Sequence, residues 1–165
     1  MKCPQCRTPM EARRENYRYD ESGLPNVVLL DVEVRKCPKC GEQAVAIPRI
    51  EELHRALAMS VIRQPGRLSP QEVRFLRKWL GWSGADFAKN IGVDPATVSR
   101  WESVEKPQAM GSTAERFLRL AVAHGQPTEE YPLERMAELA DQPRLDALVG
   151  MKAGRGGWAP AAVAA

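Results

Sequence analysis

The sequence predicts an α+β protein of two small domains, with a β-hairpin module at the N-terminus and an all-α helix-turn-helix bundle behind it. Three observations support this fold class. Two C-P-x-C pairs enclose a run of alternating apolar residues at 28–35, which is typical of a half-buried strand. From residue 49 onward, apolar residues recur at spacings of three and four, which indicates helices. Gly92 then joins two short helical segments, as in a helix-turn-helix.

Composition and charge set only broad limits on function. Charged residues make up 27% and hydrophobic residues 44% of the 165 residues, which is ordinary for a globular protein. The net charge of +3 is compatible with a polyanionic partner but is weak evidence alone. No apolar run is long enough to span a bilayer, and the first residues lack the apolar core of a signal peptide. We therefore expect no membrane contact and a cytoplasmic location.

The four cysteines predict a metal site. Each C-P-x-C pair can place two thiolates on one side of a tight turn, and two such turns complete a tetrahedral sulfur shell. The expected ligands of one structural Zn²⁺ per chain are Cys3, Cys6, Cys37 and Cys40. A redox C-x-x-C is the alternative, but no βαβ pattern surrounds either pair. Disulfides are disfavoured in a reducing compartment, and a catalytic zinc would need an open coordination position.

Residues 1–48 form the predicted zinc-binding module. The thirty residues between the cysteine pairs must fold so that the pairs meet. Val28, Leu30, Val32 and Val34 alternate with Leu29, Asp31, Glu33 and Arg35 in one strand, and 13–19 is its expected partner across a turn at 20–25. Residues 43–47 are a short third strand. Because about fifty residues bury little apolar area, zinc is expected to hold this module folded.

Residues 49–66 are predicted to be a connecting helix and a hinge. Ile50, Leu53, Leu57 and Val61 form one apolar stripe, which ends before Pro65-Gly66. His54 lies beside this stripe and is interpreted as a surface or packing residue. Pro65-Gly66 is the expected domain boundary.

Residues 67–123 are predicted to be a DNA-binding helical domain. Ser69-Pro70-Gln71-Glu72 reads as a capping box with proline at the first helical position. The next helix follows Ser83, and Thr113 begins a further helix that ends near Ala123, with Phe117 and Leu118 inward. Between them, Asp94 and Pro95 start the second helix of the helix-turn-helix.

The outer face of that second helix carries the expected DNA contacts. Arg100 is suited to bidentate contact with guanine, and Thr97 and Ser99 can bond to phosphate or base. Ala96 lies on the same face, and Lys89 is a phosphate candidate together with Arg74 and Lys106. The alternatives are a packing module with a solvated polar face and, for Arg100, a plain surface salt bridge.

Residues 68–120 resemble the Xre/Cro-type helix-turn-helix. The resemblance is carried by Leu76-Arg77, Phe87-Ala88, Ile91-Gly92-Val93, Thr97-Val98-Ser99-Arg100-Trp101-Glu102 and Pro107. With the C-P-x-C…C-P-x-C-G module in front, residues 1–123 resemble the MqsA family of antitoxins, which have a YgiT-type zinc-binding domain. Two residues depart from the pattern. Gly84 follows Ser83 at a position where relatives often have Gln, and Ala96 stands where some relatives have Asn.

That resemblance implies a function and several roles. It implies a structural zinc domain that contacts a ribonuclease toxin and a homodimer that binds a double-stranded DNA operator and represses its own operon. It also implies that Arg100 reaches bases or phosphate and that Glu102 pairs with Arg77. A solitary regulator without a toxin and a protein-interaction scaffold remain the alternatives. No Ser/His/Asp set or phosphate loop is found, so no enzyme and no catalytic residue are expected.

The resemblance does not extend to the C-terminal part. Residues 124–149 are predicted to be additional helices, at 131–139 and 143–149. Residues 150–165 are rich in Gly and Ala and are predicted to be a disordered tail.

Overall fold

The fold is known from a computed structural model, which describes residues 1–124 and 148–163. The predicted α+β class is confirmed, with a sheet that carries the four cysteines at one end and helices after it. No helix in the described ranges is long and apolar enough to cross a membrane. The elements are β1 (Glu11–Arg18), a 3₁₀ turn (Asp20–Ser22), β2 (Val27–Lys36), β3 (Gln43–Ala46), α1 (Ile50–Arg63), α2 (Pro70–Trp79), α3 (Gly84–Ile91), α4 (Pro95–Trp101), α5 (Ser112–His124), β4 (Val149–Gly154) and β5 (Gly157–Ala161).

Strand β2 is the centre of the sheet. β1 pairs with it in antiparallel register from Glu11↔Lys36 to Arg18↔Val28. On its other edge, β2 pairs with β3 over Glu33–Lys36 and with β4 over Val27–Leu30. The predicted hairpin of residues 13–19 and 28–35 and the third strand at 43–47 are therefore confirmed within one or two residues.

The predicted inward face of β2 is correct for only half of the strand. Val32 and Val34 are buried as predicted, but upstream of them Val27 and Leu29 are the fully buried residues, and Val28 and Leu30 are half-buried. The alternation of buried and exposed side chains along β2 shifts by one residue at Asp31, which has φ +54°. Opposite Asp31, the pairing with β1 shifts register between Glu15 and Tyr17. An extra residue in one strand turns every following side chain to the other face. This conformation is favoured by local bonds: Asn16 Oδ1 accepts from the Asp31 N–H, and Arg14 donates to the Asp31 carbonyl.

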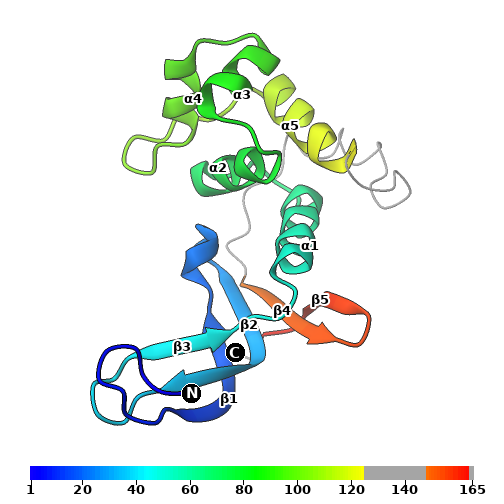
Figure 1. Cartoon of the computed structure of the whole chain (residues 1–165). Helices are drawn as coiled ribbons and strands as arrows, with labels where there is room; N and C mark the ends of the chain where they lie inside the picture. The colour runs from blue at the N-terminus through cyan, green and yellow to red at the C-terminus, as the bar shows by residue number, and fades with distance from the viewer. Residues whose placement is uncertain (125–147, 164–165) are drawn as a thin grey trace.

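The prediction of a disordered tail from residue 150 is wrong. Residues 149–154 and 157–161 form a β-hairpin, and β4 adds to β2 in parallel register from Val27↔Val149 to Leu30↔Lys152. The chain therefore returns to the N-terminal sheet after the helical part, as Figure 1 shows. Trp158 is 8% exposed, and its indole N–H donates to the Pro48 carbonyl at 2.6 Å. The helices predicted at 131–139 and 143–149 lie outside the described residues, apart from Leu148 and Val149, and Val149 begins β4.

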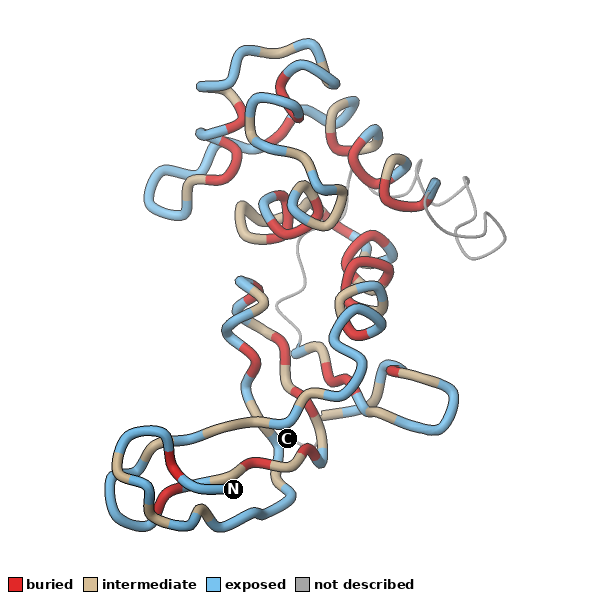
Figure 2. Tube along the Cα trace, viewed as in Figure 1, coloured by how far each residue is buried: buried red, intermediate tan, exposed pale blue. Residues whose placement is uncertain are grey.

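Helix α1 joins the sheet to the helical part. Its buried side chains belong to one apolar cluster, which extends from Tyr19 and Leu29 in the sheet to Leu118 and Val122 in α5. Figure 2 shows this buried line passing through the sheet, α1 and the helices above it. His54 lies in this region: its Nε2 is 3.0 Å from the Tyr19 hydroxyl, and its ring contacts the edge of Phe75 in α2. His54 is thus a packing residue, as interpreted from the sequence.

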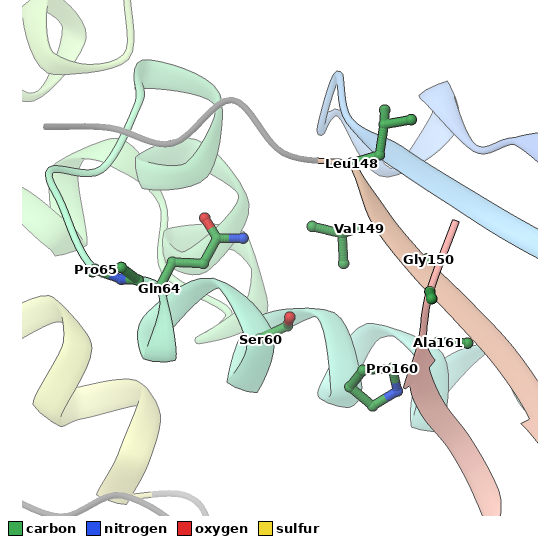
Figure 3. A pocket seen from close by; sticks show the side chains of 9 residues that line it. Ser60, Gln64, Pro65, Leu148, Val149, Gly150, Pro160 and Ala161 are labelled. Carbon is green, nitrogen blue, oxygen red and sulfur yellow. The ribbon is translucent and has the colours of Figure 1, made fainter. Parts of the chain in front are cut away.

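A cavity of about 390 Å³ lies between the end of α1 and the C-terminal hairpin (Figure 3). Ser60 of α1 and Gln64, which follows α1, border it on one side. Val149, Gly150 and Pro160 border it on the other. Among the described residues, no charged side chain lines it. The cavity marks where the hairpin and α1 come together without filling the space between them.

Candidate metal centre and nucleic-acid interface

Each cysteine pair lies in the same kind of tight turn. The Cys3 carbonyl accepts from the Arg7 N–H at 2.9 Å, and the Cys37 carbonyl accepts from the Gly41 N–H at 3.0 Å. The residue after the second cysteine is left-handed in both turns, with φ +60° at Arg7 and +76° at Gly41. Glycine accepts this conformation at no steric cost, whereas arginine adopts it because the turn requires it. The hairpin β1–β2 brings the two turns together at one end of the sheet.

The four sulfur atoms form a set that fits one tetrahedral metal ion. All four Sγ atoms lie within 4.8 Å of one another. The Cys6–Cys37 distance is 3.4 Å, the Cys3–Cys40 distance is 3.5 Å and the Cys6–Cys40 distance is 3.6 Å. With Zn–S bonds of 2.3 Å, the edges of a sulfur tetrahedron are about 3.8 Å. These separations are far longer than a disulfide bond, and all four cysteines are free thiols. The cluster can therefore bind a metal ion such as zinc.

Two of these thiols have pKa values displaced in opposite directions. Hydrogen bonding with the side chain and the backbone of Thr8 lowers the pKa of Cys6 to about 6. Cys40 receives a backbone hydrogen bond from Glu42 that lowers its pKa, but hydrogen bonds with the Cys3 and Cys37 thiols raise it to about 12. A divalent cation binds cysteines as thiolates, so its binding at this cluster would release the thiol protons.

The helix-turn-helix has the predicted caps. Ser69 and Glu72 form a capping box on α2, and Ser83 and Asp86 form one on α3. Gly92 ends α3 in the left-handed conformation, with φ +77°. Asp94 caps α4 by accepting from the Ala96 N–H at 2.8 Å, and Pro95 occupies the first helical position. These caps define where α3 ends and where α4 begins.

A buried carboxylate holds the end of α4 against α2. Glu102 is 6% exposed and accepts two hydrogen bonds from Arg77, at 2.5 and 2.9 Å. This hydrogen bonding raises the pKa of Arg77. The pairing of Glu102 with Arg77 implied by the resemblance is thus confirmed, and Arg74 adds a longer bond to the same carboxylate.

The five predicted DNA contacts lie on or beside one face. Ala96, Ser99 and Arg100 of α4 are exposed, Thr97 is half-buried, and Lys89 is exposed on α3. The Ser99 hydroxyl donates to the Pro95 carbonyl at 3.3 Å, so its oxygen can still accept a hydrogen bond from a ligand. No salt bridge or side-chain hydrogen bond of Arg100 or Lys89 is found in the described part of the chain. Their roles remain predictions.

The comparisons with known proteins agree with this geometry. Residues 73–108 match the family model described as Helix-turn-helix, which here covers α2 from Val73, α3, α4 and the loop after α4. The match supports a DNA-binding transcription regulator with a helix-turn-helix of the Xre/Cro type. No curated protein and no solved structure matches the chain significantly.

Sequence reasoning missed two members of these sites. The Cys6 thiol donates to the hydroxyl of Thr8, two residues later, at 3.3 Å, and a hydroxyl residue at that spacing is the signal in the sequence. Arg74 was predicted to contact phosphate, but its guanidinium also bonds to the Glu102 carbonyl at 3.0 Å. Arg74 and Arg77 are three residues apart on α2, so they lie on the same face of that helix. That they share Glu102 as a partner can be inferred only once the position of the end of α4 is known.

Proposed function

We propose that this protein is a sequence-specific transcriptional repressor that binds a double-stranded DNA operator as a homodimer. The observation that carries the proposal is the position of α4. Val98 and Trp101 are buried on its inner side, and Glu102 fixes its end through Arg77. Arg100 is exposed on its outer face, and its guanidinium has no hydrogen-bond or ion-pair partner among the described residues. A short helix held so firmly, with polar residues facing outward, is suited to the major groove.

Each residue on this face has a specific expected role. Arg100 donates two hydrogen bonds to O6 and N7 of a guanine, which discriminates against other bases by about 1–3 kcal/mol. Ala96 packs against a thymine methyl, and Thr97 and Ser99 bond to base edges or phosphate. Lys89 on α3 contacts phosphate, which adds affinity without reading sequence.

The cysteine cluster is proposed to hold one structural Zn²⁺. The cation would supply a fixed tetrahedral crosslink between the two turns and no open coordination position for a substrate. The protein's own contribution is the hairpin β1–β2, which brings the turns together, and the left-handed Arg7 and Gly41, which lie in the two turns. The site is therefore proposed to stabilise the fold and not to catalyse a reaction.

We further propose that the protein is the antitoxin of a type II toxin–antitoxin pair and that its zinc module contacts a ribonuclease toxin. Support comes from the order of the two modules and from the resemblance to the MqsA family. The sheet end that carries the cysteines lies at the opposite end of the molecule from α4 (Figure 1). A toxin on the zinc module would therefore leave the DNA-reading face accessible.

The decisive experiment for the toxin role is co-expression. The gene next to this one is expressed alone and together with this protein, and growth is measured. Rescue of growth by the wild type, and loss of rescue by a Cys37→Ser/Cys40→Ser variant, is the expected result. If no neighbouring gene is toxic, or if the cysteine variant rescues as well as the wild type, the protein is a regulator without a toxin contact through this module.

A further inference from the structure

The connection between α1 and α2 is held by one buried arginine. Arg119 of α5 is 1% exposed, and its guanidinium donates to the carbonyls of Ile62 at 2.8 Å, Gln64 at 3.1 Å and Gly66 at 2.7 Å. These three carbonyls belong to the last residues of α1 and to the turn after it, where Gly66 has φ +92°. The segment predicted from Pro65-Gly66 to be a hinge is therefore fixed at three points.

A second buried charge extends this contact to the start of α2. Glu115, one helical turn before Arg119, accepts from Arg119 at 2.9 Å and from the Leu68 N–H at 3.2 Å. Arg67 forms an ion pair with the other oxygen of Glu115 and donates to the Met110 carbonyl. Arg67, Glu115 and Arg119 thus tie together α1, the connection up to Leu68 just before α2, and the loop before α5. We call these three residues the clamp.

The clamp is better suited to setting the relative orientation of the helices than to adding stability to their packing. Burying a guanidinium and a carboxylate is costly, and apolar residues of the same size would pack the helices at least as tightly. Apolar contacts, however, are not directional and tolerate a change of helix angle. The planar guanidinium has donors in a fixed fork, so it can satisfy three carbonyls only when α1, the connection and α5 adopt one arrangement.

We propose that the clamp is a positioning device that holds the DNA-reading helices at one fixed angle to the metal module. α1 packs against the sheet through the same apolar cluster that reaches α5, so fixing α1 to α5 joins the two parts into one body. The fixed angle itself does not depend on the proposed function. Its consequence does: a change in the metal module would reach α3 and α4 through α1 and the clamp.

This consequence is a coupling between metal and DNA. If the metal-bound module favours the arrangement in which α4 can enter the groove, the metal raises affinity for the operator. By linkage, the operator then raises affinity for the metal by the same factor. Arg119 and Arg67 are positioning residues in this scheme and contact neither ligand.

The test measures the orientation of the two parts in solution. Residual dipolar couplings of backbone amides are recorded for the full-length, zinc-loaded protein. An alignment tensor is fitted separately to residues of β1–β3 and to residues of α2–α4. In the wild type, the two tensors are expected to agree in magnitude and direction. In Arg119→Met they are expected to differ beyond error, while the chemical shifts within each part stay close to those of the wild type.

Two further variants make the result decisive. Arg116→Met removes an arginine three residues away on the same helix. Arg116 is half-buried and makes no hydrogen bond to the connection among the described residues, so both tensors should stay equal. If Arg119→Met does not fold, the double variant Glu115→Gln/Arg119→Met takes its place, because it removes both fully buried charges together. Arg67 then loses its ion pair, but its side chain is 35% exposed and can be solvated. Equal tensors in a folded clamp variant would overturn the proposal. The proposal would also be overturned if the two tensors differed in Arg116→Met by as much as they differ in the clamp variant.

A second measurement tests the coupling. Affinity for a labelled duplex from upstream of the gene is compared with zinc bound and after chelation. For the wild type, chelation should weaken binding by about 5- to 150-fold, the usual range of coupling between sites. In Arg119→Met this dependence should be lost. If no form of the protein binds the duplex, the proposed function fails, and the dipolar couplings still decide whether the clamp fixes the angle.

Discussion

Arg100 is the residue on which specific DNA reading depends most directly. Its side chain is exposed and has no side-chain partner in the described part of the chain, so truncating it removes no contact of the folded protein. Arg100→Ala should therefore abolish specific operator binding in a gel shift. The free energy of unfolding should change by less than about 0.5 kcal/mol, as for most surface substitutions.

The matched control for Arg100→Ala is Arg55→Ala. Arg55 is an exposed arginine on α1, away from the helix-turn-helix. Removing it lowers the net charge by the same amount, so any general electrostatic loss appears in both variants. Equal gel-shift affinity of the two variants would count against docking of α4 in the groove.

His54 gives the fold a pH dependence whose sign can be stated. Burial between Tyr19 and Phe75 lowers the pKa of the His54 imidazole in the folded protein. The unfolded chain then takes up the proton at a higher pH than the folded chain does. Stability from this residue is therefore complete above the unfolded pKa of about 6.5 and is lost as the pH falls below it.

The measurement compares the pH dependence of the urea unfolding midpoint in the wild type and in His54→Gln. Between about pH 7.5 and pH 6, the urea midpoint of the wild type should fall more than that of His54→Gln. Protonation of metal-bound cysteines affects both proteins equally, so the difference isolates His54. Parallel profiles would show that His54 does not titrate differently in the folded state.

Residue identity predicted the cysteine cluster and the helix caps well but predicted local backbone conformation poorly. The cysteines, the caps at Ser69 and Ser83 and the outer face of α4 could all be predicted, because each depends on residue type at a short spacing. The left-handed Asp31 could not, since its conformation depends on Asn16 and Arg14 in another strand. Phe117, predicted to face inward, is 41% exposed, because the periodicity of α5 does not decide which of two adjacent apolar residues faces the core.

At the scale of elements, the C-terminal hairpin was the main failure of sequence reasoning. Its residues are mostly Gly and Ala with one Trp and one Pro, so neither propensity nor alternation indicates strands. Its pairing with β2 joins residues that are more than one hundred positions apart. Long-range parallel pairing leaves no local signal in the sequence, whereas the hairpin β1–β2 is indicated by its own turn and alternation.

A single glycine tests whether this hairpin forms as described. A Cβ at Gly150 would overlap the Ala161 carbonyl oxygen and lie 2.6 Å from Val163 Cγ2. Because the first of these is a backbone atom, the strands must separate. Gly150→Ala should destabilise the protein by about 1–3 kcal/mol, the usual cost of overpacking.

Gly156→Ala is the control in the same hairpin. A Cβ there meets no atom within 4 Å, and the substitution should leave the thermal midpoint nearly unchanged. Midpoints are compared by circular dichroism. A wild-type midpoint for Gly150→Ala would mean that β4 and β5 do not pair in this register.

At the scale of the whole molecule, the metal site and the C-terminal hairpin are joined through one strand. Cys37 directly follows β2, and β2 pairs with β4 near its start. Chelation of the metal should therefore broaden or collapse the amide signals of β1–β3, and those of β4–β5 should follow. Retention of the dispersed β1–β3 signals in metal-free protein would contradict a metal-folded module.

The central claim is that α4 reads an operator in DNA, and a footprint tests it most directly. Full-length, zinc-loaded protein is added to the DNA upstream of its own gene, and protection from nuclease is mapped. The expected result is protection of a two-fold symmetric site whose half-sites are about 34–36 Å apart, centre to centre. The protection should disappear with Arg100→Ala and persist with Arg55→Ala. Uniform protection along the fragment, or equal protection by both variants, would contradict the claim.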